Sequence, residues 1–218
     1  MSEYRDVSAG LAARMALTKY GFHFSHSLGQ NFILDDKLVG SIVYASGVGP
    51  GDHVLEIGPG AGVMTRHLAE AGAKVTAIEL DQSLEPVLSA VLEGVENAKV
   101  IFGDAMKLDM GEVMGDEPYK VVANLPYYIT ADVVQRMITQ EKKPEKITIM
   151  VQKEAAERMC ADPGEKNWCA LAARMQYFCE MEIIDVLPPH AFTPNAHVDS
   201  ALIGCRYYDR ARSEEAHV

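Results

Sequence analysis

The sequence lacks the features that mark several other classes of protein. It has no run near the ~18 unbroken apolar residues of a membrane-spanning helix. Its first residues are polar and acidic, unlike a signal peptide. Its four cysteines form no C-x-x-C pair, and no histidine cluster has metal-ligand spacing. We therefore expect a cytoplasmic protein with reduced thiols, no metal ion and no membrane partner.

Positive charge is also scarce. The chain has 20 Lys and Arg residues against 31 Asp and Glu residues, which gives a formal net charge of −11. That balance argues against a protein whose whole surface binds nucleic acid. Residues 41–135 carry 5 basic and 14 acidic residues, whereas residues 136–174 carry 8 basic and 6 acidic. A basic face would have to come from this second stretch, and it would be weak.

Strand and helix patterns alternate along most of the chain. Short apolar runs such as Ile147–Val151 are typical of strands buried on both faces. The alternation predicts a parallel sheet between layers of helices, and two late strands around a Pro-rich loop predict an antiparallel hairpin at its edge. The predicted strands are 53–57, 74–78, 99–102, 120–123, 147–151, 181–187 and 200–207. The predicted helices are 11–20, 35–45, 63–71, 82–92, 131–139, 154–160 and 168–178.

A glycine-rich segment, Glu56–Gly62, follows the first predicted strand and opens a helix. Glycines there let the backbone turn and come close to a ligand. A dinucleotide fingerprint would read G-x-G-x-x-G and cradle a pyrophosphate. Here the glycines fall as G-x-G-x-G, and Val63 takes the place of the last glycine. The spacing favours a ligand without pyrophosphate, although such a turn is also compatible with a structural role.

Two carboxylates follow the next two predicted strands. Glu79 ends the second strand, where a carboxylate can bind both hydroxyls of a ribose. Asp104 follows the third strand and can accept a hydrogen bond from the exocyclic amine of adenine. A solvated strand end is the alternative interpretation of Glu79. Because ligands bind at the carboxyl ends of such strands, the three strand ends together point to one adenosine-like ligand.

The tetrapeptide Asn124-Leu125-Pro126-Tyr127 follows the fourth predicted strand. The side-chain oxygen of Asn124 and the backbone carbonyl of Leu125 can each accept one N–H of an aryl amine, which would turn its lone pair towards a methyl donor. Pro126 stiffens the turn, and Tyr127 can stack on a base. The pattern favours methyl transfer that depends mainly on orientation and electrostatics. A plain strand-ending turn is the alternative.

These segments resemble the KsgA (RsmA) family of ribosomal RNA adenine dimethyltransferases along nearly all of residues 20–207. The most specific match is Leu28–Phe32, which reads Leu-Gly-Gln-Asn-Phe. The other matching segments are 54–65, 77–81, 103–105, 122–128, 150–154 and 192–200.

The resemblance implies an α/β fold, namely a Rossmann-like class I S-adenosylmethionine-dependent methyltransferase with a mostly parallel sheet and an antiparallel C-terminal hairpin strand. It implies a methyltransferase domain over residues 1–208, in which residues 1–35 supply an N-terminal helix and a segment that covers the cofactor. A polar tail, 209–218, follows. Family members continue into a small helical domain that helps to grip the rRNA, and we expect that domain to be absent here.

The resemblance also assigns roles to individual residues. The residues implied to bind S-adenosylmethionine are Asn31, Ile33, Gly58, Gly60, Glu79, Leu80, Asp104, Ala105 and Asn124. The residues implied to hold the target adenine are Asn124, Leu125, Pro126, Tyr127 and Phe192. None is assigned to a metal.

The sequence thus predicts a monomeric enzyme that methylates N6 of adenine in RNA, with rRNA or the small ribosomal subunit as its partner. Family members dimethylate two adjacent adenosines in small-subunit rRNA, so 16S rRNA is the expected substrate. One alternative is an N-methyltransferase acting on another RNA, such as 23S rRNA, or on a smaller amine; the acidic balance favours it. A second alternative is a ribosome-assembly binding protein with secondary or lost activity, against which the intact Asn124–Tyr127 argues.

Overall fold

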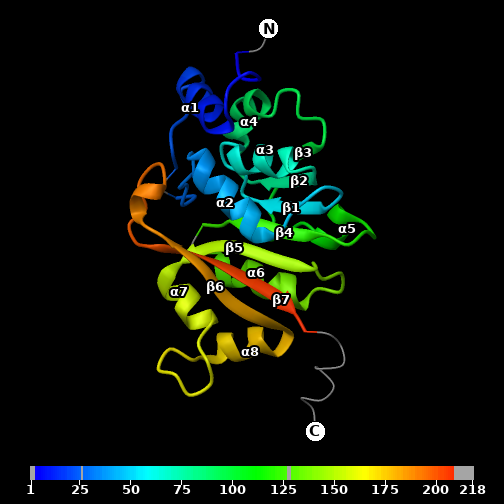
Figure 1. The fold of residues 1–218 in the computed structure, drawn as a ribbon, viewed down its shortest axis with the longest axis vertical. Helices are drawn as coiled ribbons and strands as arrows, with labels where there is room; N and C mark the ends of the chain where they lie inside the picture. The colour runs from blue at the N-terminus through cyan, green and yellow to red at the C-terminus, as the bar shows by residue number, and fades with distance from the viewer. Residues whose placement is uncertain (1–2, 26, 127–128, 209–218) are drawn as a thin grey trace.

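A seven-stranded sheet organises the chain. The computed structural model describes residues 3–25, 27–126 and 129–208. The strands are β1 (His53–Ile57), β2 (Lys74–Glu79), β3 (Ala98–Phe102), β4 (Lys120–Asn124), β5 (Lys146–Gln152), β6 (Cys179–Leu187) and β7 (Ser200–Tyr207). Their order is β3-β2-β1-β4-β5-β7-β6 (Figure 1). The first five strands pair in parallel, and β7 runs antiparallel to both β5 and β6, which confirms the predicted mostly parallel sheet with an antiparallel C-terminal hairpin.

Eight α-helices are found among the described residues. They are α1 (Ala9–Lys19), α2 (Asp36–Ser46), α3 (Val63–Glu70), α4 (Glu85–Val91), α5 (Met110–Met114), α6 (Thr130–Thr139), α7 (Lys153–Met159) and α8 (Ala170–Phe178). Asp35 caps α2, since its carboxylate accepts from the backbone N–H groups of Lys37 and Leu38. None of these helices has the length and apolar character needed to cross a membrane.

Two differences from the predicted helices have local causes. The predicted helix 82–92 is a 3-10 turn, Gln82–Leu84, followed by α4. Pro86 has no N–H to donate to a carbonyl one turn earlier, so it fits only the first turn of an α-helix, and α4 begins just before it. The five-residue α5 is too short to show a helical period, and only its cap, Asp109, marks its start.

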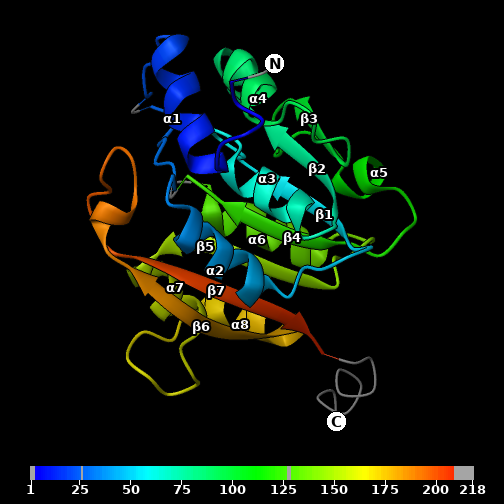
Figure 2. The same ribbon diagram turned by 45° about the horizontal axis from the view of Figure 1, so that its top comes forward.

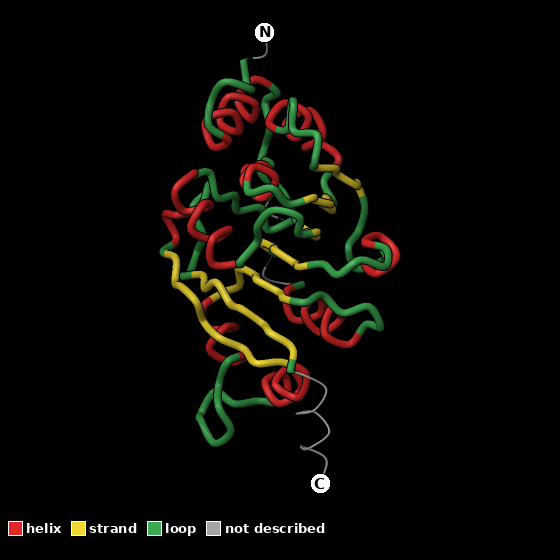
Figure 3. Tube along the Cα trace, turned by 45° about the vertical axis from the view of Figure 1, so that its right-hand side comes forward, coloured by secondary structure: helices red, strands yellow, loops and turns green. Residues whose placement is uncertain are grey.

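The strands alternate between two apolar cores. Val54 and Val122 face α1 to α4, whereas their neighbours Leu55 and Val121 face α5 to α8. Figure 3 shows the strands passing through the middle of the molecule with helices on both sides. Figure 2 shows α1 beside α4, in the layer that also holds α3. Burial on both faces explains why these strands are almost continuously apolar in sequence.

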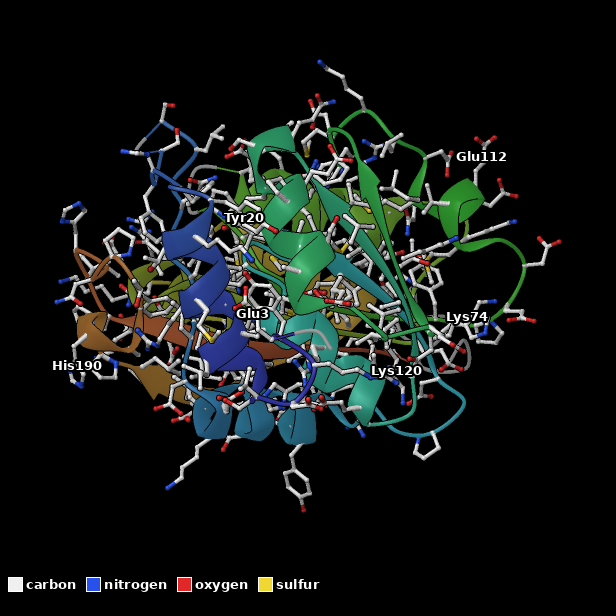
Figure 4. The ribbon with its side chains drawn as sticks, turned by 90° about the horizontal axis from the view of Figure 1, so that it is seen from above. Glu3, Tyr20, Lys74, Glu112, Lys120 and His190 are labelled. Atoms are coloured by element: carbon white, nitrogen blue, oxygen red, sulfur yellow. The ribbon has the colours of Figure 1, made fainter. Side chains whose placement is uncertain are left out.

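The loop after β6 lies at the same edge of the sheet as the carboxyl ends of the parallel strands. Lys74 and Lys120, the first residues of β2 and β4, appear at one side of the molecule in Figure 4, and His190 appears at the opposite side. The sheet thus brings residues 188–199 to the edge where Glu79 and Asn124 end their strands.

Candidate active site

A pocket opens at the carboxyl ends of β1 to β4, where doubly wound sheets bind ligands. The segment Leu28–Phe32, called the covering segment below, forms part of the pocket wall. Strand ends and the turns that follow them form the rest. The lining residues lie at 28–32, 57–58, 60, 78–80, 84, 103–106, 124–126 and 129. The sheet therefore gathers the three predicted strand-end signals, and the tetrapeptide through Pro126, around one cavity.

Two glycines of the Glu56–Gly62 loop are required by conformation and by space. Gly58 and Gly60 have φ values of 73° and 55°, in the left-handed region that favours glycine. A Cβ at Gly60 would lie 2.8 Å from the ring of Phe32, and one at Gly58 would lie 3.3 Å from the carbonyl oxygen of Asn124. The loop can therefore lie against both the covering segment and β4 only because it has no side chains there.

Glu79 is held in place by two backbone amides. Its side chain is buried, with one carboxylate oxygen accepting from Gly60 N at 3.1 Å and the other from Asp81 N at 2.8 Å. Burial raises the pKa of the Glu79 carboxyl above its usual range, and the two amide hydrogen bonds oppose that shift. The carboxylate thus links the glycine loop to the end of β2, and the two hydrogen bonds fix its position at the pocket where a ribose-binding group is predicted.

Asp104 organises the turn after β3. Its Oδ1 accepts from Met106 N at 2.9 Å, and its backbone carbonyl accepts from the N–H groups of Lys107 and Leu108. The Lys107 ammonium lies 3.5 Å from Oδ2. Gly103, Asp104, Ala105 and Met106 all line the pocket, so this turn supplies both a carboxylate and apolar contacts.

The covering segment is tied down at three points. The Gln30 side chain donates to Asp81 Oδ2 at 2.6 Å. Asp81 follows Glu79, the residue predicted to bind the ribose, by two positions. The carbonyl of Asn31 accepts from the Asn124 side chain at 2.9 Å. Phe32 and Thr193 exchange two backbone hydrogen bonds, at 2.9 and 2.8 Å. The segment thus connects the β2 end, the β4 end and the loop after β6.

The contact with Asn31 fixes how the Asn124 amide is turned. A backbone carbonyl can only accept a hydrogen bond, so the atom facing it must be the Asn124 nitrogen, Nδ2. The other end of the amide, Oδ1, is then available as an acceptor in a residue that lines the pocket. This is the orientation that an amine-binding role for Asn124 requires.

Sequence reasoning missed Glu56. This side chain is 1% exposed, and among the described residues its Oε2 has no hydrogen-bond partner. Burial raises the pKa of Glu56 to about 8, the nearby Thr65 hydroxyl lowers it, and the Glu79 charge raises it further. Glu56 lines a smaller cavity beside the pocket. The smaller cavity and the pocket share four lining residues, Phe32, Gly58, Gly60 and Asn124. The available signal was a charged residue inside the apolar run 54–57.

The structure brings most of the predicted site residues together. The pocket is lined by Asn31, Gly58, Gly60, Glu79, Leu80, Asp104, Ala105, Asn124, Leu125 and Pro126.

Two predicted residues, Ile33 and Phe192, do not line this pocket. Ile33 lines the smaller neighbouring cavity. Phe192 is 2% exposed, packs in the core under α1 to α4 and is not among the residues that line the pocket. Tyr127 lies outside the described residues. The roles of Phe192 and Tyr127 at a target base stay predictions.

The chain is similar to proteins that have been named before. A family model described as ribosomal RNA adenine dimethylase matches residues 21–214. The protein named Ribosomal RNA small subunit methyltransferase A from Clostridioides difficile (strain 630) is 40% identical over 210 residues. That match covers 94% of this chain and 73% of the relative.

Two solved structures are also similar. A dimethyladenosine transferase from Plasmodium falciparum is 28% identical with a TM-score of 0.73, covering 84% of this chain and 65% of that one. The 23S rRNA methyltransferase ErmE is 29% identical with a TM-score of 0.73, covering 85% of this chain and 75% of that one. These likenesses confirm the predicted Rossmann-like methyltransferase fold.

Proposed function

The chain belongs to the ribosomal RNA adenine dimethylase family, and from this premise we propose that it methylates N6 of adenine in ribosomal RNA with S-adenosylmethionine as the methyl donor. The names of the relatives favour small-subunit (16S) rRNA as the substrate. The family model, described as an adenine dimethylase, favours dimethylation, and the family resemblance implies that two adjacent adenosines are modified. The observation that carries the proposal is the meeting of Glu79, Asp104 and Asn124 in one pocket.

The residues of the pocket fit S-adenosylmethionine. In this proposal Glu79 accepts from the ribose hydroxyls and Asp104 from the adenine amine, and both residues line the pocket. Gly58 and Gly60, which have no side chains, let the pocket wall pack closely against Asn124 and Phe32. The buried Oε2 of Glu56, beside them, suits the ammonium of the methionine part, because a cation would supply the missing partner.

Asn124 and Leu125 orient the target amine in this proposal. When bound, S-adenosylmethionine supplies a methyl group on a positively charged sulfonium. The Asn124 Oδ1, left as an acceptor by the bond to Asn31, takes one N–H of the amine, and the Leu125 carbonyl takes the other. Both bonds draw the amine out of conjugation with its ring, so its lone pair becomes nucleophilic. No side chain has to act as a strong base, since the proton can leave to water after transfer.

The test is transfer of labelled methyl groups to ribosomal subunits. We expect the protein to label small subunits that lack the modification and to leave already modified subunits unlabelled. A protein that binds S-adenosylmethionine normally yet labels no small subunit would contradict the substrate assignment while leaving the cofactor assignment intact.

A second candidate substrate is 23S rRNA. The likeness to ErmE, with the same TM-score as the dimethyladenosine transferase, favours it. The same assay with large-subunit RNA as the acceptor separates the two. Label confined to 23S rRNA would replace the first candidate by the second without changing the chemistry.

A further inference from the structure

An arginine outside the pocket is bonded to the turn that carries Asp104. Arg136 lies on α6, and its guanidinium donates to three backbone carbonyl oxygens. They belong to Ala105 at 3.3 Å, to Met106, and to Leu108 at 2.7 Å. All three acceptors lie within four residues of Asp104, and two of them, Ala105 and Met106, line the pocket.

Two residues hold the turn by hydrogen bonds. Asp104 accepts the N–H groups at the start of the turn, from Met106 to its side chain and from Lys107 and Leu108 to its carbonyl. Arg136 donates to the carbonyls of Ala105, Met106 and Leu108. The arrangement is like a helix end, where the last carbonyls have no partner within the helix and attract a cation.

The Arg136 guanidinium interacts with this turn through backbone carbonyls rather than through an ion pair. Among the described residues no carboxylate forms an ion pair with Arg136, and its hydrogen-bond partners are the three carbonyl oxygens. A planar guanidinium with five N–H donors can bind three carbonyls at once, which an ammonium cannot do equally well. Since α6 starts four residues after Pro126, Arg136 also connects the helix after the tetrapeptide to the adenine side of the pocket.

We propose that Arg136 is a positioning residue that sets the selectivity of the cofactor pocket for adenine, by holding the turn that presents Asp104. The inference rests on the proposed function, because it takes the pocket's ligand to be S-adenosylmethionine. Without the guanidinium, three partly buried carbonyls lose their partner and the turn relaxes. Asp104 then no longer faces the 6-amino group in a fixed geometry, and an adenine loses its advantage over a ring that lacks this amine.

The test compares two ligands in the full chain by calorimetry. S-Adenosylhomocysteine carries the 6-amino group, and S-inosylhomocysteine carries an oxygen in its place. We expect Arg136→Met to weaken binding of the adenosyl ligand by about tenfold and binding of the inosyl ligand much less, so that their ratio falls. Arg136→Lys keeps the charge but bonds fewer carbonyls, and it should give an intermediate ratio.

Arg66 offers a matched control. It also donates to three backbone carbonyls, those of Tyr4, Arg5 and Val7, but in the N-terminal segment and away from the pocket. Arg66→Met should lower the melting temperature and leave the ligand ratio unchanged. If the Arg136 variants lower the melting temperature and keep the wild-type ratio, Arg136 is only structural and the inference is overturned. If the wild-type chain binds neither ligand, the proposed function itself fails.

Discussion

The two sides of the candidate active site are built differently. On the cofactor side, Glu79 and Asp104 are each fixed by hydrogen bonds from neighbouring backbone amides, and both line the pocket. On the side assigned to the target base, Phe192 is buried in the core, and Thr193 is joined to the covering segment through Phe32. The side proposed to bind the cofactor is therefore fixed by hydrogen bonds within the chain, whereas the side proposed to bind the base presents Asn124, Leu125 and Pro126 among the described residues.

The largest effect should come from the residue where the two sides meet. Asn124→Ala removes the acceptor for the amine, and we expect single-turnover methyl transfer to fall by about 100- to 1,000-fold or more. Cofactor affinity should fall less than the transfer rate, because Glu79 and Asp104 are untouched, although the variant also loses the hydrogen bond from Asn124 to the Asn31 carbonyl. A methyl-transfer rate within a few-fold of the wild-type rate would mean that Asn124 has no part in the mechanism. The two sides of the site would then not differ in function as proposed.

Glu79→Ala should act on the cofactor side. The change deletes the ribose acceptor and leaves the N–H groups of Gly60 and Asp81 without their partner. We expect the affinity for S-adenosylhomocysteine, measured by calorimetry, to fall by about 10- to 100-fold. At saturating cofactor, transfer should recover much of its wild-type rate. An unchanged affinity would mean that the ribose does not lie at Glu79.

Gly60→Ala tests how closely the glycine loop must approach the covering segment. The new methyl group would meet the Phe32 ring at 2.8 Å, so the segment must shift and cofactor affinity should fall by about tenfold. Gly21→Ala is the control, since Gly21 has a similar φ of 61° but has open space around its Cβ position. Both variants should lose about 1–2 kcal/mol of stability through backbone strain. Equal cofactor affinities in the two variants would contradict the role of close packing.

The last effect is on stability rather than on binding or transfer; it concerns Glu56 and depends on pH. Its pKa of about 8 in the folded chain lies above the ordinary 4.5, so folding takes up a proton between these values. The stability it contributes is complete below pH 4.5 and is lost as the pH rises towards 8. Relative to Glu56→Gln, the wild type should therefore lose about 1 kcal/mol of unfolding free energy per pH unit in this window. Parallel urea-denaturation profiles for the two proteins from pH 5 to 8 would show that Glu56 does not titrate there.

The cofactor side could be predicted from sequence because its signals are local. Each signal is a short motif at the end of one strand: the glycine loop directly follows β1, Glu79 ends β2 and Asp104 closely follows β3. The parallel sheet then brings these strand ends together without further information. The bounds of β1 and β7 were predicted to the residue. Even here, Glu56 was missed, because its importance lies in burial without a partner, which only the three-dimensional structure shows.

The base side depends on contacts between distant segments, and sequence alone does not supply these. The pairing of Phe32 with Thr193 joins residues that are 161 positions apart, and no sequence motif predicts it. Phe192 was assigned to the target base through a family resemblance, yet its side chain packs in the core. Likewise, three carbonyls of the Asp104 turn meet Arg136 about 30 residues later in the chain, through the packing of α6 rather than through any local pattern.

The most direct test of the central claim is identification of the modified nucleoside. Small-subunit RNA lacking the modification should be incubated with the protein and S-adenosylmethionine, digested to nucleosides and analysed by mass spectrometry, with the Asn124→Ala variant in parallel. We expect N6,N6-dimethyladenosine with the wild type and none with the variant. A methyl group on a ribose or on another base, or equal product from both proteins, would contradict the claim.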